Sequence, residues 1–177
     1  MINQPVASRG RVSGVLLVLL GAWGALVPFI GPYFGYAYTP DKAWAYTSGR
    51  LVLSILPGVL VVLGGLMVMA SDGAAAVGGF FAAVGGAWFV VGAEVVAVVA
   101  HSGSYVPGSP VVASGTAVSP ATMRLLEHVG FFTGLGVVIL FFGALALGKA
   151  VIARLAGGRH AAPATAATEE REYGQIN

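Results

Sequence analysis

The sequence contains no cysteine and few charged residues, and both absences exclude whole classes of protein. Without cysteine the chain forms no disulfide, offers no thiolate metal site and has no cysteine nucleophile. Charged residues make up 9% of the chain, whereas soluble domains carry about 25%. This shortfall indicates that much of the protein surface does not face water. No basic patch, phosphate-binding loop or hydrolase motif is present, so we expect neither an enzyme nor a nucleic-acid-binding protein.

Hydrophobic residues instead account for 57% of the chain, and they gather in long runs. A helix that crosses a bilayer needs about 20 mostly apolar residues, and four runs have that length. The predicted spans cover residues 12–30, 51–70, 74–100 and 129–147. We therefore expect an all-α membrane protein, a bundle of four transmembrane helices in a lipid bilayer. Residues 1–11 would precede the bundle, residues 12–156 would form it, and residues 157–177 would be a disordered tail.

The first apolar run also allows a second interpretation, as a secretory signal peptide. Two arginines before an apolar stretch are typical of such a peptide. The stretch is too long for a typical signal core, and Trp23, Pro28 and Phe29 stand where small cleavage-site residues would be expected. We therefore interpret the run as a membrane span.

Basic residues predict the orientation of the bundle. Arg9 and Arg11 precede the first span, while Lys149, Arg154 and Arg159 follow the fourth. Connections on the cytoplasmic side of a membrane carry an excess of Lys and Arg. Four spans place these two ends on one side, so we expect both termini in the cytoplasm and the two long connections outside.

The two halves of the chain share a pattern. A shift of 65 residues places Gly21-Ala22-Trp23 of the first span on Gly86-Ala87-Trp88 of the third. The second span then falls on the fourth with a longer connection between, so that Gly58 meets Gly136 and Gly65 meets Gly143. The pattern predicts a duplicated two-helix hairpin. Two such hairpins would be parallel repeats related by an axis along the membrane normal.

This pattern resembles the SPW-repeat family of small bacterial membrane proteins, in which a Gly-x-Trp helix is followed by a Ser-Pro-Trp motif and a second apolar helix. Here Val27-Pro28-Phe29 stands at the Ser-Pro-Trp place of the first half and keeps the proline, while Gly92-Ala93-Glu94 in the second half keeps none of the motif. The resemblance covers most of residues 12–148. It implies the four-helix architecture and a bacterial inner-membrane location, and it implies no activity.

Small residues predict how the helices pack. Lipid tails are as apolar as leucine, so membrane helices associate where small residues let their backbones approach closely. We expect this role for glycines at seven-residue spacing on the third span and for a GxxxG pair on the fourth: Gly78, Gly85, Gly92, Gly130 and Gly134. A stripe of alanines on the other side of the third span predicts contacts with two neighbours. Homodimerisation through one of these seams is the alternative.

A proline and a glutamate interrupt the apolar runs. Pro57 removes a backbone hydrogen bond inside the second span and predicts a kink there. Glu94 lies within the apolar run 90–100, and a charge in such a run usually faces the bundle interior with a partner. Arg50 and Arg124 are the partners expected at its level, and we favour Arg124.

Six ionisable residues are expected at the outer level of the bundle, together with aromatic residues of the first connection. They are Arg50, Glu94, His101, Arg124, Glu127 and His128. Side chains at such a level ordinarily reach headgroups and water, which is the simplest interpretation of the cluster. The four residues Glu94, His101, Glu127 and His128 are also acceptable ligands for zinc or iron, and His101 and His128 are candidate ligands for a haem between them. The Glu-x-x-His signature of di-iron bundles is absent, so we expect no metal and no cofactor.

Three functions fit these features. The leading hypothesis is a non-enzymatic accessory or scaffold subunit that packs against a membrane-protein partner or against itself. A sensor or small-solute binder that uses the outer polar and aromatic cluster is the alternative, and a haem- or metal-binding redox protein comes third. The apolar midplanes of all four spans argue against a hydrophilic pore through one chain.

Overall fold

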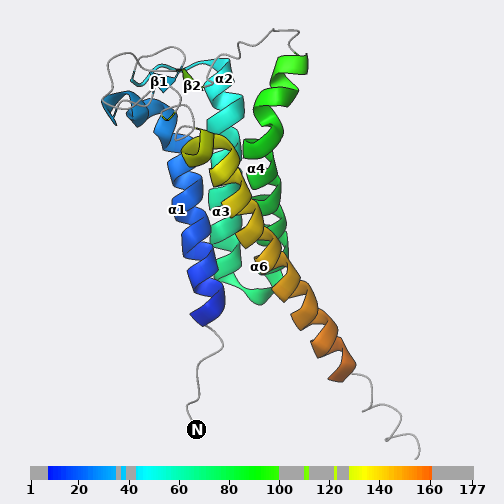
Figure 1. The fold of residues 1–177 in the computed structure, drawn as a ribbon. Coiled ribbons are helices and arrows are strands. Elements are labelled where there is room, and N and C mark those ends of the chain that lie inside the picture. Colours follow the sequence, from blue (N-terminus) through cyan, green and yellow to red (C-terminus); the bar gives the residue numbers. More distant parts are fainter. Residues whose placement is uncertain are drawn as a thin grey trace, which may run out of the picture.

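The computed structural model describes residues 8–34, 37–38, 43–99, 110–111, 122 and 128–160 of the chain. Its α-helices are α1 (Ser8–Ile30), α2 (Ser48–Arg50), α3 (Leu56–Ala70), α4 (Asp72–Val99) and α6 (Thr133–His160). Shorter elements complete it: the 3-10 turn η1 (Gly31–Phe34), the π-helical turns η2 (Leu51–Ile55) and η3 (His128–Phe132), and the strands β1 (Ala37–Tyr38) and β2 (Pro110–Val111). The elements α2, η2 and α3 follow one another without a break and form one long helix, which packs with α1, α4 and α6 in a bundle (Figure 1).

Four helices are long and apolar enough to cross a membrane, as the sequence predicts. These segments run over Arg11–Tyr33, Ser48–Ala70, Asp72–Val96 and Thr133–Ala156. The last helix differs from its prediction, because it continues past residue 147 to His160. Lysine and arginine residues end the apolar run after residue 147. Because these residues are good helix formers, as are the alanines and leucine around them, the helix continues beyond the end of the apolar run. The tail expected from residue 157 therefore begins inside α6, and residues 161–177 lie outside the described part.

The helices pack in chain order, α1 on α3, α3 on α4 and α4 on α6. Here the term 'outer end' denotes only the end of the bundle that carries β1 and β2, and 'inner end' denotes the opposite one. Helix α6 meets α1 again toward the outer end and then slopes away from the bundle, so that its last turns project alone (Figure 1). At the outer end, β1 pairs with β2 in a short antiparallel ladder, with Ala37 opposite Val111. This ladder, which the sequence did not predict, joins the two long connections.

Pairs of glycines hold each hairpin together. A Cβ added to Gly21 of α1 would lie 2.9 Å from the carbonyl oxygen of Gly58 in α3, and one added to Gly58 would lie 2.8 Å from the carbonyl oxygen of Gly21. The pair Gly86 and Gly136 joins α4 to α6 with the corresponding distances of 2.9 and 2.7 Å. A real Cβ does not fit at such distances, so the two backbones can touch only because these residues are glycine.

Helix α4 contacts two neighbours, as predicted, but by a different device from the alanine stripe. Two pairs of adjacent glycines, Gly78-Gly79 and Gly85-Gly86, make these contacts: the first glycine of each pair faces α3 and the second faces α6. A Cβ at Gly85 would meet the carbonyl oxygen of Pro57 at 2.9 Å, and one at Gly86 would meet the amide nitrogen of Leu140 at 2.6 Å. Gly78 likewise faces α3, and Gly79 faces α6.

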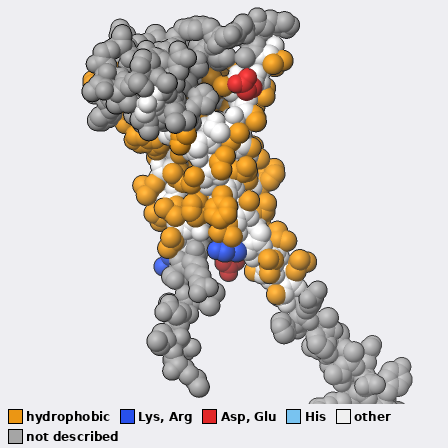
Figure 2. Space-filling view, in the orientation of Figure 1, with side chains coloured by type: hydrophobic (Ala, Val, Ile, Leu, Met, Phe, Trp, Pro, Cys, Tyr) orange, Lys and Arg blue, Asp and Glu red, His pale blue; other side chains and the backbone are white. Residues whose placement is uncertain are grey.

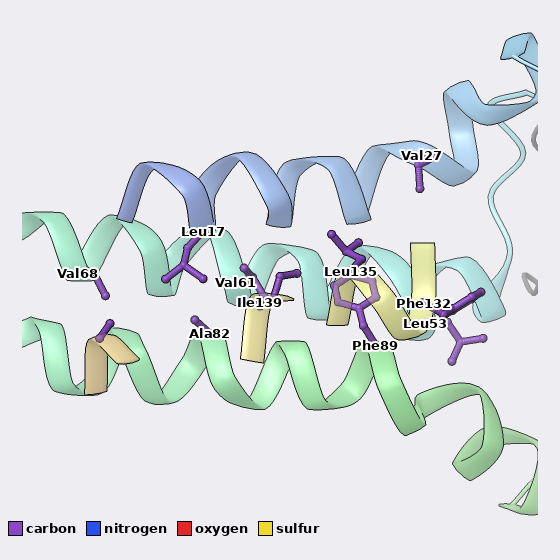
Figure 3. Packing of buried hydrophobic residues seen from close by; sticks show 11 residues of the cluster. Leu17, Val27, Leu53, Val61, Val68, Ala82, Phe89, Phe132, Leu135 and Ile139 are labelled. Carbon is purple, nitrogen blue, oxygen red and sulfur yellow. The ribbon is translucent and has the colours of Figure 1, made fainter. Parts of the chain in front are cut away.

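The core runs along the centre of the bundle, and its side chains come from all four long helices. Leu17 of α1, Val61 of α3, Ala82 of α4 and Ile139 of α6 are fully buried and stack between the helices (Figure 3). Around this core every long helix turns large apolar side chains outward; on α1 these are Val12, Val15, Leu19, Trp23 and Leu26.

Apolar side chains also cover the outside of the bundle. Figure 2 shows hydrophobic side chains over the middle of the visible face and charged ones only toward its two ends. A water-soluble bundle carries polar side chains on its outer face. The observed surface is instead compatible with an apolar solvent around the middle of the bundle.

A wide turn precedes Pro57. In η2 the N–H of Leu56 donates to the carbonyl of Leu51, five residues back instead of four. This turn puts Pro57 at the beginning of α3. Because the helix is continuous there, the missing N–H of Pro57 still leaves a carbonyl of η2 without its helical donor.

Candidate functional site

The outer end of the second long helix, which consists of α2, η2 and α3, is organised around a buried arginine. The hydroxyl of Thr47 accepts a hydrogen bond from the N–H of Arg50 at 3.1 Å and so caps α2. The side chain of Arg50 is 0% exposed. Its Nη1 donates to the carbonyl of Ala45 at 2.9 Å, and its guanidinium carbon lies 5.8 Å from the centre of the Phe29 ring. The latter contact is a cation–π interaction.

Aromatic rings surround this arginine and complete a unit that we call the outer cap: Phe29, Trp44, Tyr46 and Arg50. The ring of Phe29 lies 6.0 Å from that of Trp44 and 5.2 Å from that of Tyr46, centre to centre. Phe29 is buried, whereas Trp44 is 53% and Tyr46 77% exposed. The outer cap therefore presents two aromatic side chains to the surroundings above a buried positive charge.

Trp44 holds an uncommon backbone conformation. Its φ angle is 58°, in the left-handed region that bulky side chains rarely occupy. Such a conformation costs about 1–3 kcal/mol and persists only where the surrounding contacts over-determine it. The contact with Phe29 is one such constraint.

Glu94 does not pair with Arg50, the less favoured of its two expected partners. Its side chain is exposed, and within the described residues it forms neither an ion pair nor a hydrogen bond. The physical reason is its position: it lies near the outer end of α4, where an exposed carboxylate reaches headgroups or water. Arg50 is turned instead toward Phe29 and Ala45.

The rest of the predicted polar cluster lies beyond what the structure describes. His101, Arg124 and Glu127 are outside the described residues, and of His128 only the backbone, at the beginning of η3, is described. Among the side chains that are described, no three His, Asp or Glu residues lie close enough together to hold a metal ion. The favoured pairing of Glu94 with Arg124 stays a prediction, and the metal and haem hypotheses are not tested by the described residues.

Two tryptophans make hydrogen bonds that the sequence reasoning missed. The indole Nε1 of Trp88 in α4 donates to the carbonyl of Val52 in η2 at 2.9 Å. The indole Nε1 of Trp23 in α1 donates to the carbonyl of Gly130 in η3 at 3.3 Å. Each bond joins one hairpin to a π-helical turn of the other. The repeated Gly-Ala-Trp pattern pointed to these residues but not to their acceptors.

Three glycines expected to pack helices through their missing side chains have other roles, and two of these roles are local. A Cβ at Gly92 would lie 2.8 Å from the Nε1 of Trp88, so this glycine makes room for the indole of its own helix. A Cβ at Gly134 would collide with the carbonyl of Val129 in the adjacent π-helical turn. Gly130 supplies the carbonyl that accepts from Trp23. The glycines that pack α6 on α4 are Gly136 and Gly143 instead.

The inner end of the bundle is simpler. Arg154 of α6 donates through its Nη2 to the carbonyl of Gly73, at the beginning of α4. This bond sets Arg154 level with the turn between α3 and α4. The six residues from Val151 to Ala156 are all exposed, and they include Ile152 at 68% and Leu155 at 65%. We call this segment, 151–156, the α6 overhang.

No protein-family model, no curated protein and no solved structure matches this chain.

Proposed function

We propose that the protein is a non-enzymatic, multi-pass membrane protein that serves as an accessory subunit and binds a membrane-protein partner through the α6 overhang. The overhang carries the proposal, because it exposes large apolar side chains at the level where the bundle ends. The same reasoning allows a second copy of the chain as the partner, and the mass of a cross-linked product distinguishes the two.

Membrane insertion is supported by the four long apolar helices and by the apolar outer surface. In the orientation that we propose, both termini lie in the cytoplasm and the membrane is the bacterial inner membrane. Its support is the charge at the inner end of the bundle, where Arg11, Lys149 and Arg154 are exposed. Cytoplasmic ends of membrane helices are enriched in such residues.

The length of α6 supports a position of the α6 overhang outside the hydrocarbon core of the bilayer. The 28 residues of α6 span about 42 Å at about 1.5 Å per residue, against a hydrocarbon core of about 30 Å. Arg154, level with the turn between α3 and α4, marks the inner boundary. Ile152 and Leu155 flank that level, where a leucine or isoleucine gains nothing from exposure to water. Burial of each against a protein partner would contribute about 1.5–3 kcal/mol.

Site-directed cross-linking tests this proposal directly, because the chain has no native cysteine. Leu155→Cys would place a thiol on the overhang, and Leu19→Cys would place one on the outward face of α1 as a matched control. In native membranes, a bifunctional reagent should link the first variant, and not the second, to a different protein. A product of twice the monomer mass would identify a second copy as the partner. No product, or equal products from both sites, would contradict the proposal.

We infer in addition that the two hairpins are a duplication. Under shifts of 65 residues for α1 onto α4 and 78 residues for α3 onto α6, the contact of Gly21 with Gly58 becomes that of Gly86 with Gly136. The contact of Gly14 with Gly65 becomes that of Gly79 with Gly143, so both glycine pairs of one hairpin recur in the other. This recurrence supports one hairpin design used twice.

The core supports the same inference. Leu17 and Ala82 are counterparts under these shifts, as are Val61 and Ile139, and all four are 0% exposed. Gly24 faces its own counterpart Phe89, and a Cβ added to it would lie 2.5 Å from the ring. A residue that touches its counterpart lies close to the axis relating the two halves. The small residue here makes room for the large one.

A second candidate function, binding of a small solute, is favoured by the outer cap. Trp44 and Tyr46 are exposed beside a buried guanidinium, and strained residues such as Trp44 are found more often at binding sites than elsewhere. The protein has three tryptophans that fluoresce, and only one of them, Trp44, belongs to the outer cap. A ligand that quenches the fluorescence of wild type but not of Trp44→Phe would support this function, and equal quenching of both would contradict it.

A further inference from the structure

The wide turn η2 leaves the backbone carbonyl of Val52 without a donor in its own helix. The N–H of Leu56 donates to Leu51, five residues back. In this register the carbonyl of Val52 would next accept from residue 57, but residue 57 is proline and has no N–H. The indole of Trp88 donates to this carbonyl instead, at 2.9 Å.

A regular α-helix through the same residues would also leave one carbonyl without a donor. In that register the N–H of Leu56 would donate to Val52, four residues back. The carbonyl of Leu53 would then lack a donor, because Pro57 has no N–H, and the proline ring would crowd the same carbonyl. The wide turn leaves two carbonyls without a helical donor, because the return from five-residue to four-residue spacing skips one more. The backbone hydrogen bonds alone therefore favour the regular turn by one bond, whereas relief of the Pro57 ring favours the wide turn.

Trp88 offsets this difference, because its indole N–H donates to the carbonyl of Val52, which only the wide turn leaves free. We propose that the outer end of the second helix has two registers, the wide turn and a regular helical turn, and that Trp88 selects the wide turn. Trp88 reaches Val52 because Gly92 leaves space for its ring: a Cβ at Gly92 would lie 2.8 Å from the indole nitrogen.

The register determines the state of the outer cap. Loss of the extra residue in the turn rotates the segment before it by about 100° relative to α3, the angle of one residue in an α-helix. That segment carries Arg50, so the guanidinium would leave the Phe29 ring and the carbonyl of Ala45. A perturbation that displaces Trp88 between the hairpins would therefore change the surface that Trp44 and Tyr46 present. The device couples the packing of the two hairpins to the outer face.

The second π-helical turn offers a matched control. Trp23 donates to the carbonyl of Gly130 in η3 at 3.3 Å, a longer bond. The counterpart of Pro57 there is Leu135, which has an N–H. The hydrogen bond from Trp23 therefore does not replace one that a proline removes. Loss of this bond should leave the register of η2 unchanged.

Ser54 provides the reporter, because it lies inside η2, is 0% exposed, and its hydroxyl has no hydrogen-bond partner among the described residues. Ser54→Cys is therefore a conservative change in a chain that otherwise lacks thiols. The measurement is the rate at which a small thiol reagent modifies this cysteine in the full-length protein in mild detergent. Trp88→Phe, which keeps most of the ring and removes the donor, should raise the rate about tenfold. Trp23→Phe should leave it within about twofold.

Two further variants keep the test decisive. Gly92→Ala displaces the indole without removing it, and should raise the rate as Trp88→Phe does. Pro57→Ala supplies the missing N–H and removes the ring, so that only the wide turn keeps an orphan carbonyl. The regular turn is then favoured with or without the indole, and the effect of Trp88→Phe should vanish in that background. Equal rates for Trp88→Phe, Gly92→Ala and the parent would overturn the proposal, as would an equal increase from Trp23→Phe. If Trp88→Phe does not fold, the rate for Gly92→Ala, alone and in the Pro57→Ala background, decides between the same two outcomes.

Discussion

Gly86→Ala should destabilise the protein, although alanine is the better helix former. The added Cβ would lie 2.6 Å from the amide nitrogen of Leu140 and 2.9 Å from the carbonyl oxygen of Gly136. Both atoms belong to the backbone of α6, so no side-chain rotation can relieve the contact. The two helices must separate by several tenths of an ångström along the interface. Overpacking of this kind costs about 1–3 kcal/mol.

The matched control for this variant is Gly148→Ala. It makes the same substitution in the partner helix α6, at a glycine whose added Cβ would meet nothing within 4 Å. Alanine there should stabilise the helix by about 0.5–1 kcal/mol, because it removes the backbone entropy of glycine. The assay is thermal unfolding in one mild detergent. Equal melting temperatures for the two variants would refute the argument that α4 and α6 pack backbone to backbone.

The two ends of the bundle give two further predictions. Glu94→Gln should change the unfolding free energy by less than about 0.5 kcal/mol, since the carboxylate is exposed and has no partner within the described part of the chain; a loss of stability comparable to that of Gly86→Ala would mean that the charge is paired after all. Cysteines at Ser109, in the second long connection, and at Thr165, in the C-terminal tail, should differ in intact cells, with a membrane-impermeant thiol reagent labelling only the first; labelling of Thr165 alone would reverse the orientation.

Hydropathy predicted the four helices because apolar length is a local property. The glycine seam on the third span, together with the alanine stripe on its other side, also predicted that α4 packs on two sides. It could not predict that adjacent glycines, such as Gly85 and Gly86, divide that work between α3 and α6. That division depends on where the neighbouring helices lie, and only the fold determines this.

Nonlocal partners explain the other differences. Pro57 predicted a disturbance of its helix, but the wide turn also requires Trp88, which lies 36 residues from its acceptor Val52 in the chain. Glu94 was expected to be paired because it interrupts an apolar run, yet its level on α4 lets it reach polar surroundings. The end of α6 was placed too early because hydropathy marks the end of an apolar run and not the end of a helix.

The accessory-subunit proposal is tested most directly by the mass of the complex that the protein forms. The protein would be extracted from its native membrane in mild detergent and measured by native mass spectrometry, together with Leu155→Ser on the overhang and Leu19→Ser on the outward face of α1 as a control. We predict that wild type and Leu19→Ser carry a second, different protein at a fixed ratio and that Leu155→Ser loses it. A wild-type protein that is monomeric, or a complex that Leu155→Ser leaves intact, would contradict the proposal.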